Sequence, residues 1–324
     1  MRDGDSALGD KSRRSGVNNQ MQTWSLALCL SDETNRYQRA VRDDAVLASQ
    51  RAGIRLDVSF AEDSVTQQMR QVLGVLNADP DQRPRAVIIM PVRASSSLDR
   101  CARQAAESGI GWVCISRTMD SLGRLQAEFP SVPISFLTPD QYETGRIQGR
   151  QFRALFPGGC KLLYVQGEAT STSAQGRLKG MKEAISGTNI ELAGTLDGNW
   201  TEADAERVVS NFLRIVLSGP QRIDLLGCQN DEMAVGALKA LSGVAKYLRR
   251  PEVAKIPVTG CDGLPDVGQE LVNRGQLAAT VIMPSTGAPA VELIARALSS
   301  GKQPPAEVKL SPVSFPPEQA LRPR

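Results

Sequence analysis

Short apolar segments and amphipathic helical segments alternate along almost the whole chain from Trp24 onward. Residues 54–60 alternate apolar and polar side chains as a half-buried strand does, and residues 65–76 repeat apolar side chains at helical spacing. Repeated strand–helix units connect parallel strands, because each helix returns the chain to the same end of the sheet. The pattern therefore predicts an α/β fold with parallel sheets flanked by helices.

The alternation can be followed segment by segment. Strands are predicted at residues 24–30, 54–60, 86–90, 112–115, 134–137, 161–165, 190–196, 223–228, 256–260 and 277–282. Helices are predicted at residues 37–52, 65–76, 98–105, 142–155, 174–185, 202–217, 232–241, 264–272 and 288–298. A short strand-like piece, 308–313, lies in the proline-rich tail.

A chain of 324 residues is long enough for two lobes, and its two halves look like two copies of one architecture. The rhythm breaks between Ser116 and Pro133, so we place a lobe crossing there or just after it. We predict a first lobe of residues 23–135 plus 284–302 and a second lobe of residues 136–283 plus 303–315. Two Rossmann-like lobes linked by a hinge would enclose a ligand cleft.

Several function classes are disfavoured by composition. The chain contains no histidine, which removes Ser-His-Asp triads, Cys-His pairs and histidine-ligated zinc. Its net charge of +3 is too small to indicate binding of nucleic acid or an anionic membrane. Residues 1–22 are polar, lack the apolar segment of a secretory signal and are too short for a DNA-binding domain, so we interpret them as a disordered tail.

The six cysteines form no CxxC pair, so neither a zinc ribbon nor a dithiol redox site is predicted. Most of them lie in or at the end of predicted strands: Cys29, Cys114, Cys228 and Cys261. We interpret these four as small buried side chains in the reduced form, which fits a cytosolic protein better than one from an oxidising compartment.

Two junctions carry polar residues directly after a predicted strand. Asn230 lies at the expected N-cap of a helix after the strand 223–228, and Asp262 follows the strand 256–260. Ligands of α/β sheets bind beyond the carboxyl ends of the strands. Two such junctions facing one crevice predict a small-molecule site.

Other polar or aromatic residues follow predicted strands in the same way: Ser31, Asn35, Tyr37, Ser116, Arg117, Arg177 and Trp200. Each also has a plain structural interpretation, as a helix cap, a surface cation or a core aromatic. The loop 167–173 is rich in Ser and Thr but lacks the lysine and the spacing of a P-loop. The shared position of these residues after successive strands favours one binding site.

The chain resembles the type I periplasmic sugar-binding protein family, which includes ribose-binding protein. The lactose-repressor family uses the same module as its sensor domain. The residues that carry this resemblance are the segments 230–234 with 236–238, 261–263 with 265–266, and 275–280, together with Asp140, Gly145, Arg177 and Gly180. The resemblance spans residues 24 to about 315.

The resemblance implies a ligand role for nine residues: Ser31, Asn35, Tyr37, Ser116, Arg117, Arg177, Trp200, Asn230 and Asp262. Some positions depart from the family pattern. Gln38 stands where an aromatic is common, Ser116 replaces a carboxylate and Cys261 replaces an aromatic of ribose binders. Met283 stands near a position where some members have glutamine. The resemblance thus implies a sugar-like or other small polar ligand without specifying ribose.

Our leading hypothesis is a non-catalytic protein that closes its hinge on a monosaccharide or polyol, as the solute receptor of an ABC transporter. It would be periplasmic by resemblance and a monomer, with no cofactor and no metal, and a permease as partner. We expect neither nucleic-acid binding nor membrane insertion. A ligand-sensing module of a transcription regulator or signalling system is the first alternative, and an enzyme is the second. A cytoplasmic location is the alternative to a periplasmic one.

Overall fold

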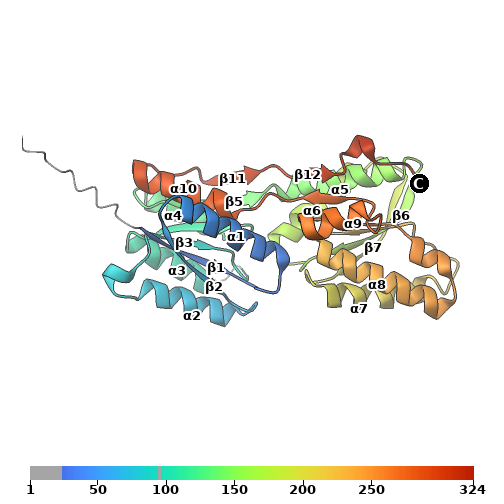
Figure 1. The fold of residues 1–324 in the computed structure, drawn as a ribbon, viewed down its shortest axis with the longest axis horizontal. Helices are drawn as coiled ribbons and strands as arrows, with labels where there is room; N and C mark the ends of the chain where they lie inside the picture. Colours follow the sequence, from blue (N-terminus) through green and yellow to red (C-terminus); the bar gives the residue numbers. More distant parts are fainter. Residues whose placement is uncertain (1–23, 94–95) are drawn as a thin grey trace, which may run out of the picture.

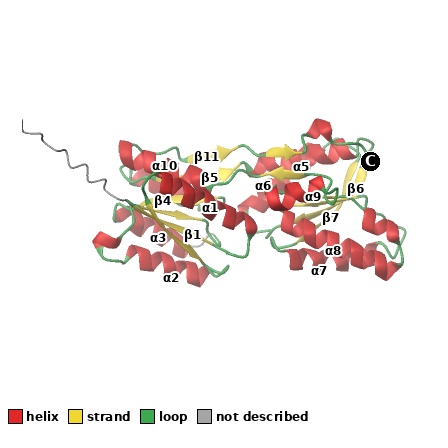
Figure 2. Ribbon diagram, viewed as in Figure 1, coloured by secondary structure: helices red, strands yellow, loops and turns green. Residues whose placement is uncertain are grey.

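The computed structural model describes residues 24–93 and 96–324, so the predicted tail 1–22 lies outside the described residues. Two α/β lobes lie end to end, and helices cover both faces of the main sheet in each (Figures 1 and 2). This architecture confirms the predicted fold class of two parallel-sheet lobes flanked by helices.

The first lobe contains a six-stranded parallel sheet in the order β11-β5-β4-β3-β1-β2. Its strands are β1 (Ser25–Leu30), β2 (Arg55–Phe60), β3 (Ala86–Ile89), β4 (Gly111–Ile115), β5 (Ile134–Pro139) and β11 (Glu307–Leu310). Helices α1 (Arg36–Arg51) and α10 (Gly287–Ser300) cover one face, and α2 (Val65–Leu76), α3 (Ser96–Glu107) and α4 (Leu122–Glu128) cover the other. In β1, Leu28 packs toward α1 while Cys29 packs toward α2 and α3, as the period of two requires.

The second lobe contains a four-stranded parallel sheet in the order β7-β6-β8-β9. Its strands are β6 (Cys160–Gln166), β7 (Ile190–Asp197), β8 (Leu225–Cys228) and β9 (Val258–Thr259). Helices α5 (Gln141–Leu155) and α6 (Thr172–Ile185) pack on one face, and α7 (Glu202–Val216) and α8 (Asp231–Leu248) pack on the other. After the short α9 (Glu270–Asn273), strand β10 (Thr280–Ile282) pairs antiparallel with β12 (Val313–Phe315).

The sheet pairing corrects the predicted lobe boundaries. Strand β5 pairs with β4 from Ile134 to Leu137, so the chain leaves the first lobe after β5 and not at residue 135. Strand β11 also belongs to the first sheet, although we assigned residues 303–315 to the second lobe. The crossing was predicted within the stretch 116–133 or just after it; the stretch itself contains α4, and the chain crosses just after it, beyond β5. Strand partners are chosen by tertiary pairing, which the local pattern does not reveal.

Helices α5 and α6 touch backbone to backbone, and two glycines make this possible. A Cβ atom on Gly145 would lie 2.0 Å from the carbonyl oxygen of Arg177, and one on Gly180 would lie 2.0 Å from that of Tyr142. The close approach fixes α6 against α5, and α6 carries Arg177. The two glycines thus position one of the predicted site residues.

All six cysteines are buried and free. Cys29, Cys114 and Cys228 lie within strands, and Cys261 lies two residues after the end of β9, close to the predicted strand end. Within the described parts of the chain, no helix combines the length and the apolar character needed to cross a bilayer.

Candidate functional site

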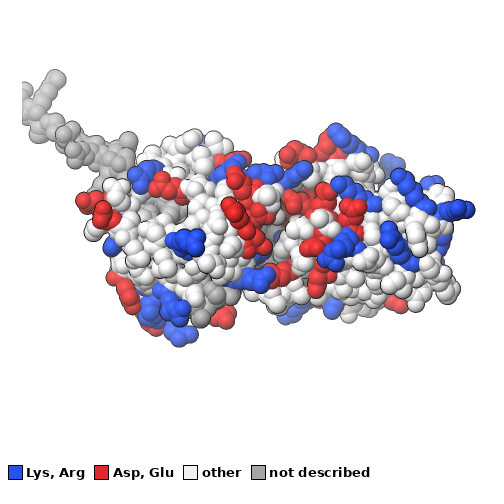
Figure 3. All heavy atoms as spheres, turned by 90° about the horizontal axis from the view of Figure 1, so that it is seen from below, with Lys and Arg blue, Asp and Glu red and all other residues white. Residues whose placement is uncertain are grey.

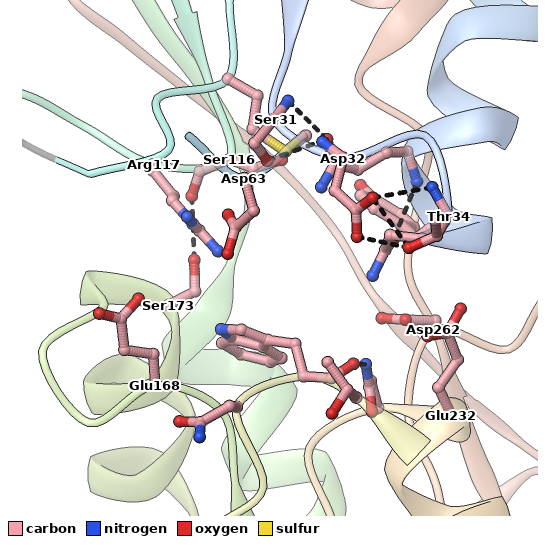
Figure 4. A pocket seen from close by; sticks show the side chains of 18 of the residues that line it. Ser31, Asp32, Thr34, Asp63, Ser116, Arg117, Glu168, Ser173, Glu232 and Asp262 are labelled. Carbon is pink, nitrogen blue, oxygen red and sulfur yellow. Dashed lines mark hydrogen bonds between the residues drawn. The ribbon is translucent and has the colours of Figure 1, made fainter. Parts of the chain in front are cut away.

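A cavity of about 430 Å³ lies between the two lobes, and loops that follow strands of both sheets line it (Figure 4). The structure brings all nine predicted site residues to this one cavity: Ser31, Asn35, Tyr37, Ser116, Arg117, Arg177, Trp200, Asn230 and Asp262. Their convergence follows from the topology, because the carboxyl ends of parallel strands meet at one edge of each sheet. Their part in ligand binding stays a prediction.

Arg177 is the most thoroughly held of the polar residues. It is 6% exposed, and its Nε donates to Oε1 of Gln141 at 2.8 Å. Its Nη1 donates to the carbonyl oxygen of Gln229. The planar guanidinium group therefore enters the cavity in a fixed orientation, with Nη2 not used by these bonds.

Asp262 faces Arg177 at the start of the loop after β9. Its Oδ1 lies 3.9 Å from Arg177 Nη1, and its side chain is 12% exposed. The backbone has φ 102°, a region that residues other than glycine rarely adopt. A bridge to Ile282 holds this conformation, since the Asp262 N–H donates to the carbonyl of Val281 and the Asp262 carbonyl accepts from the Met283 N–H. Strain of this kind persists where the surrounding structure enforces it, often at ligand sites.

Burial raises the pKa of Asp262 well above its usual range, while the charge of Arg177 opposes that rise and Asp231 adds to it. Among the described residues, none donates a hydrogen bond to the Asp262 carboxylate. This carboxylate is therefore an acceptor that the protein itself leaves largely unsatisfied.

Asn230 and Trp200 form a second group in the same lobe. The Asn230 side chain caps α8, where its Oδ1 accepts the Met233 N–H at 2.8 Å, and its Nδ2 donates to the Trp200 carbonyl at 2.9 Å. The helix-cap interpretation of Asn230 is thus correct, and one amide N–H is left for a ligand. The indole of Trp200 presses on Gly167, where a Cβ atom would lie 2.0 Å from the ring.

The first loop of the other lobe is organised by Gln38. Its Oε1 accepts from the N–H of Ser31 at 2.9 Å, the hydroxyl of Ser31 at 3.0 Å and the N–H of Asp32 at 3.1 Å. The residue that replaces an aromatic of the family pattern is therefore a structural acceptor here. Asn35 caps α1 by accepting the Gln38 N–H at 3.1 Å.

Tyr37 was expected to pack on the ligand, and it does line the cavity. Its hydroxyl, however, donates to the carbonyl of Pro284 at 3.0 Å. Pro284 lies in the segment that connects β10 to α10, so this bond ties the first lobe to one of the lobe connections. Tyr37 thus acts at the hinge side of the cavity.

Ser116 and Arg117 follow β4. Ser116 has φ 61°, is 8% exposed, and its hydroxyl has no hydrogen-bond partner among the described residues. Arg117 donates through Nη1 to the carbonyls of Pro91 and Val92. Burial lowers the pKa of Arg117, and the nearby carboxylate of Asp63 opposes this effect.

Twelve residues that line the cavity were not among the predicted ones: Asp32, Thr34, Gln38, Asp63, Met90, Arg93, Gln141, Glu168, Ser173, Asn199, Thr201 and Glu232. The rule that polar residues follow strands applies to some of them equally well. Asp63 follows the predicted strand 54–60, and Arg93 follows the strand 86–90. Ser173 and Glu232 lie in the first turns of α6 and α8, two residues after the N-caps Ser171 and Asn230.

Three contacts span the cavity from lobe to lobe. Glu232 of α8 accepts the backbone N–H of Arg36 at 2.9 Å, and Glu168 pairs with Arg93 at 3.2 Å. Ser173 of α6 donates through its hydroxyl to the carbonyl of Ser116 at 3.0 Å. The lobes therefore touch across the cleft, and the structure represents a closed arrangement.

A family model described as "Periplasmic binding protein domain" matches residues 26–303. The ribose import binding protein RbsB of Escherichia coli (strain K12) is 25% identical over 287 residues, which cover 88% of this chain and 88% of that protein.

Two solved structures have a similar fold. The periplasmic binding protein component of the arabinose ABC transporter from Shewanella sp. ANA-3 has a TM-score of 0.77 at 22% identity, covering 91% of this chain and 93% of that one. The fructose binding periplasmic domain of a hybrid two component system has a TM-score of 0.75 at 24% identity, covering 90% of each chain. These structural likenesses concern the fold.

Proposed function

The chain belongs to the periplasmic binding protein domain family, and from this premise we propose that it binds a small polyhydroxylated solute without chemical conversion. The solute, a monosaccharide or a polyol, is held in the cavity between the lobes. Binding stabilises the closed arrangement relative to an open one, because only the closed lobes offer both halves of the site.

The single observation that carries this proposal is the pairing of Arg177 and Asp262 at the closed cavity. A buried guanidinium group and a buried carboxylate lie 3.9 Å apart, and each keeps bonding capacity toward the cavity. A sugar hydroxyl both donates and accepts, so it can bond to both groups at once. Such charge-assisted hydrogen bonds give a binding protein affinity for a ligand that carries hydroxyl groups.

The proposed ligand contacts come from both lobes. In the first lobe we assign Ser31, Asn35, Tyr37, Ser116 and Arg117, and in the second Arg177, Trp200, Asn230 and Asp262. The Trp200 ring supplies a flat surface for the C–H face of a sugar ring. Because Asn35 and Asn230 are also helix caps, their contribution to the ligand is limited to the groups that the caps leave unused.

We further propose that the protein works in the periplasm as the solute receptor of an ABC transporter, and that the transporter permease binds its closed form. This role rests on the ribose import relative and on family membership. The fructose binding domain of a hybrid two component system supports a second candidate, a sensor domain that uses the same closure to signal.

Thermal unfolding in the presence of sugars, polyols and small acids tests the binding proposal. A ligand present at 100 times its dissociation constant stabilises the folded protein by about 2.7 kcal/mol. The proposal expects such a shift with at least one polyhydroxylated compound, and recovery of that compound unchanged. Stabilisation by none of them, or conversion of the bound compound, would contradict it.

A further inference from the structure

The cavity between the lobes carries more negative than positive charge. Five carboxylates line it, those of Asp32, Asp63, Glu168, Glu232 and Asp262, together with three guanidinium groups, those of Arg93, Arg117 and Arg177. The chain has no histidine, so the formal excess is two negative charges. Figure 3 shows acidic side chains on both sides of the groove where the lobes meet, together with basic ones.

Three of the acids lie on the same side of the cavity: Asp32, Glu232 and Asp262 (Figure 4). Among the described residues, neither Asp32 nor Glu232 forms an ion pair, and Asp262 meets Arg177 only at 3.9 Å. Asp32 accepts from Thr34, and Glu232 accepts one backbone N–H.

The arginines of the cavity are bound mainly to groups other than these three acids. Arg117 donates to two backbone carbonyls, and Arg93 pairs with Glu168. Arg177 is bound to Gln141 and to the carbonyl of Gln229. The side chains of two other arginines near Glu232 do not line the cavity: Arg36 and Arg39. Asp262 therefore meets a cavity arginine at 3.9 Å, whereas Asp32 and Glu232 have no ion-pair partner among the described residues.

Burial and mutual repulsion act on these acids in the same direction. Burial raises the pKa of Glu232 and of Asp262. At Glu232 the N–H of Arg36 and the charges of Arg36 and Arg39 oppose the rise and the charge of Asp32 adds to it, and at Asp262 the charge of Arg177 opposes the rise. The charge of Glu232 adds to the rise at Asp262. Like charges that are taken out of water together are unfavourable, and a bound cation removes most of that penalty.

A second observation is independent of the acids. The hydroxyl of Ser116 and the indole N–H of Trp200 are buried at the cavity and have no hydrogen-bond partner among the described residues. Buried polar groups are almost always paired in a folded protein. A ligand rich in hydroxyl groups supplies the missing partners. The groups that complement the cavity are therefore hydrogen-bonding groups as well as a positive charge.

We propose that the ligand is a cationic polyol, a sugar or cyclitol in which an ammonium group takes the place of one hydroxyl and is directed at Asp32, Glu232 and Asp262. This inference rests on the proposed binding function and narrows its ligand class. An ammonium group donates three hydrogen bonds and offsets the excess negative charge. A neutral hydroxyl donates one hydrogen bond and leaves the charge unchanged.

Calorimetric titration of the full chain with matched pairs tests the inference. The pairs are glucosamine with glucose and an aminodeoxyinositol with myo-inositol. We expect at least one amine to bind tenfold or more tightly than its hydroxyl partner, and the difference to shrink at high salt. If neutral compounds bind as tightly as or more tightly than the amines, the inference fails while the binding function stands. If neither class binds, the proposed function fails with it.

Two substitutions locate the ammonium group. In the double variant Asp32→Asn with Glu232→Gln, both side chains keep an oxygen that can accept the hydrogen bonds of Thr34 and Arg36. We expect the affinity ratio of amine to hydroxyl compound to fall at least tenfold. The control is Glu33→Gln, which removes an exposed acid of the same loop that does not line the cavity. An unchanged ratio in the double variant would overturn the assignment.

Discussion

The guanidinium carbon of Arg177 lies 5.3 Å from the centre of the Trp200 indole ring. Arg177 comes from α6 and Trp200 from the loop after β7, so this cation–π contact joins a helix and a strand-end loop of the second lobe. Because Arg177 also pairs with Asp262, its side chain contacts two other residues of the proposed site, Trp200 and Asp262.

Replacing Arg177 by alanine is expected to weaken ligand binding by about 2–4 kcal/mol, because it leaves buried polar groups without a partner. Asp262→Ala is expected to have an effect of the same size. Arg207→Ala, which removes an exposed arginine of α7, serves as the control. Titration calorimetry checks this prediction, and native affinity in both site variants would remove Arg177 and Asp262 from the site.

Replacing Gly180 by alanine is expected to destabilise the protein by about 1–3 kcal/mol, because the new Cβ atom would collide with the backbone of α5. The matched control is Gly74→Ala in α2, where nothing lies within 4 Å of a Cβ atom. That substitution is expected to stabilise by about 0.5–1 kcal/mol. Denaturant unfolding measures both, and equal effects would contradict the role of Gly180.

Asp231 gives the stability of the fold a pH dependence. Burial raises the pKa of this carboxyl from 3.8 to about 7, although the hydroxyl of Thr280 at 2.7 Å and the N–H of Gly263 at 2.8 Å oppose the rise. Between about pH 4 and pH 7 the folded protein therefore holds a proton that the unfolded chain releases. The free energy of unfolding is expected to fall as pH rises through this window and to level off above it.

The variant Asp231→Asn checks this origin of the pH dependence. Asparagine keeps an acceptor for Gly263 and can donate to Thr280, but it does not titrate. We expect a shallower decline between pH 4 and pH 7 and greater stability above pH 7. A remaining decline is assigned to Asp262, whose raised pKa acts with the same sign. Identical profiles for the variant and the native protein would refute the assignment.

Replacing Gln38 by alanine is expected to destabilise the first lobe by about 1–3 kcal/mol, because three donors lose one common acceptor. Ligand affinity should fall as well, since Ser31 and Asp32 line the cavity. Gln50→Ala, at an exposed position of the same helix, is the control. Thermal unfolding and titration together measure both effects, and a change in neither would show that Gln38 does not organise the loop.

The local pattern predicted most helices and strands because each depends on residues close in sequence. Residues 54–60 alternate apolar and polar side chains, which fits a strand. Residues 65–76 carry an apolar stripe, which fits a helix packed on a sheet. Polar residues after strands also predicted that these side chains converge on one cavity, since the carboxyl ends of parallel strands must share an edge.

The local sequence pattern did not predict which strands pair with one another. Nothing in residues 307–310 distinguishes a strand that pairs with β5 from one in the other lobe, so the lobe boundary was wrong there. Helix α4 was also missed. Its apolar stripe is short, and the surrounding residues 116–133 are of mixed polarity, so no helical period stands out.

By itself the sequence determined the α/β class, the two lobes and nine of the residues that line the cavity, because these follow from periodicity and from the ends of strands. Only the tertiary structure decided how those residues are used. It assigned Asn230 to a cap, Tyr37 to a lobe connection and Gln38 to a loop, and it gathered acids from separate loops on one side of the cavity. Hydrogen bonds and charge interactions of this kind act between side chains far apart in sequence, so they exist only once the lobes have folded and met.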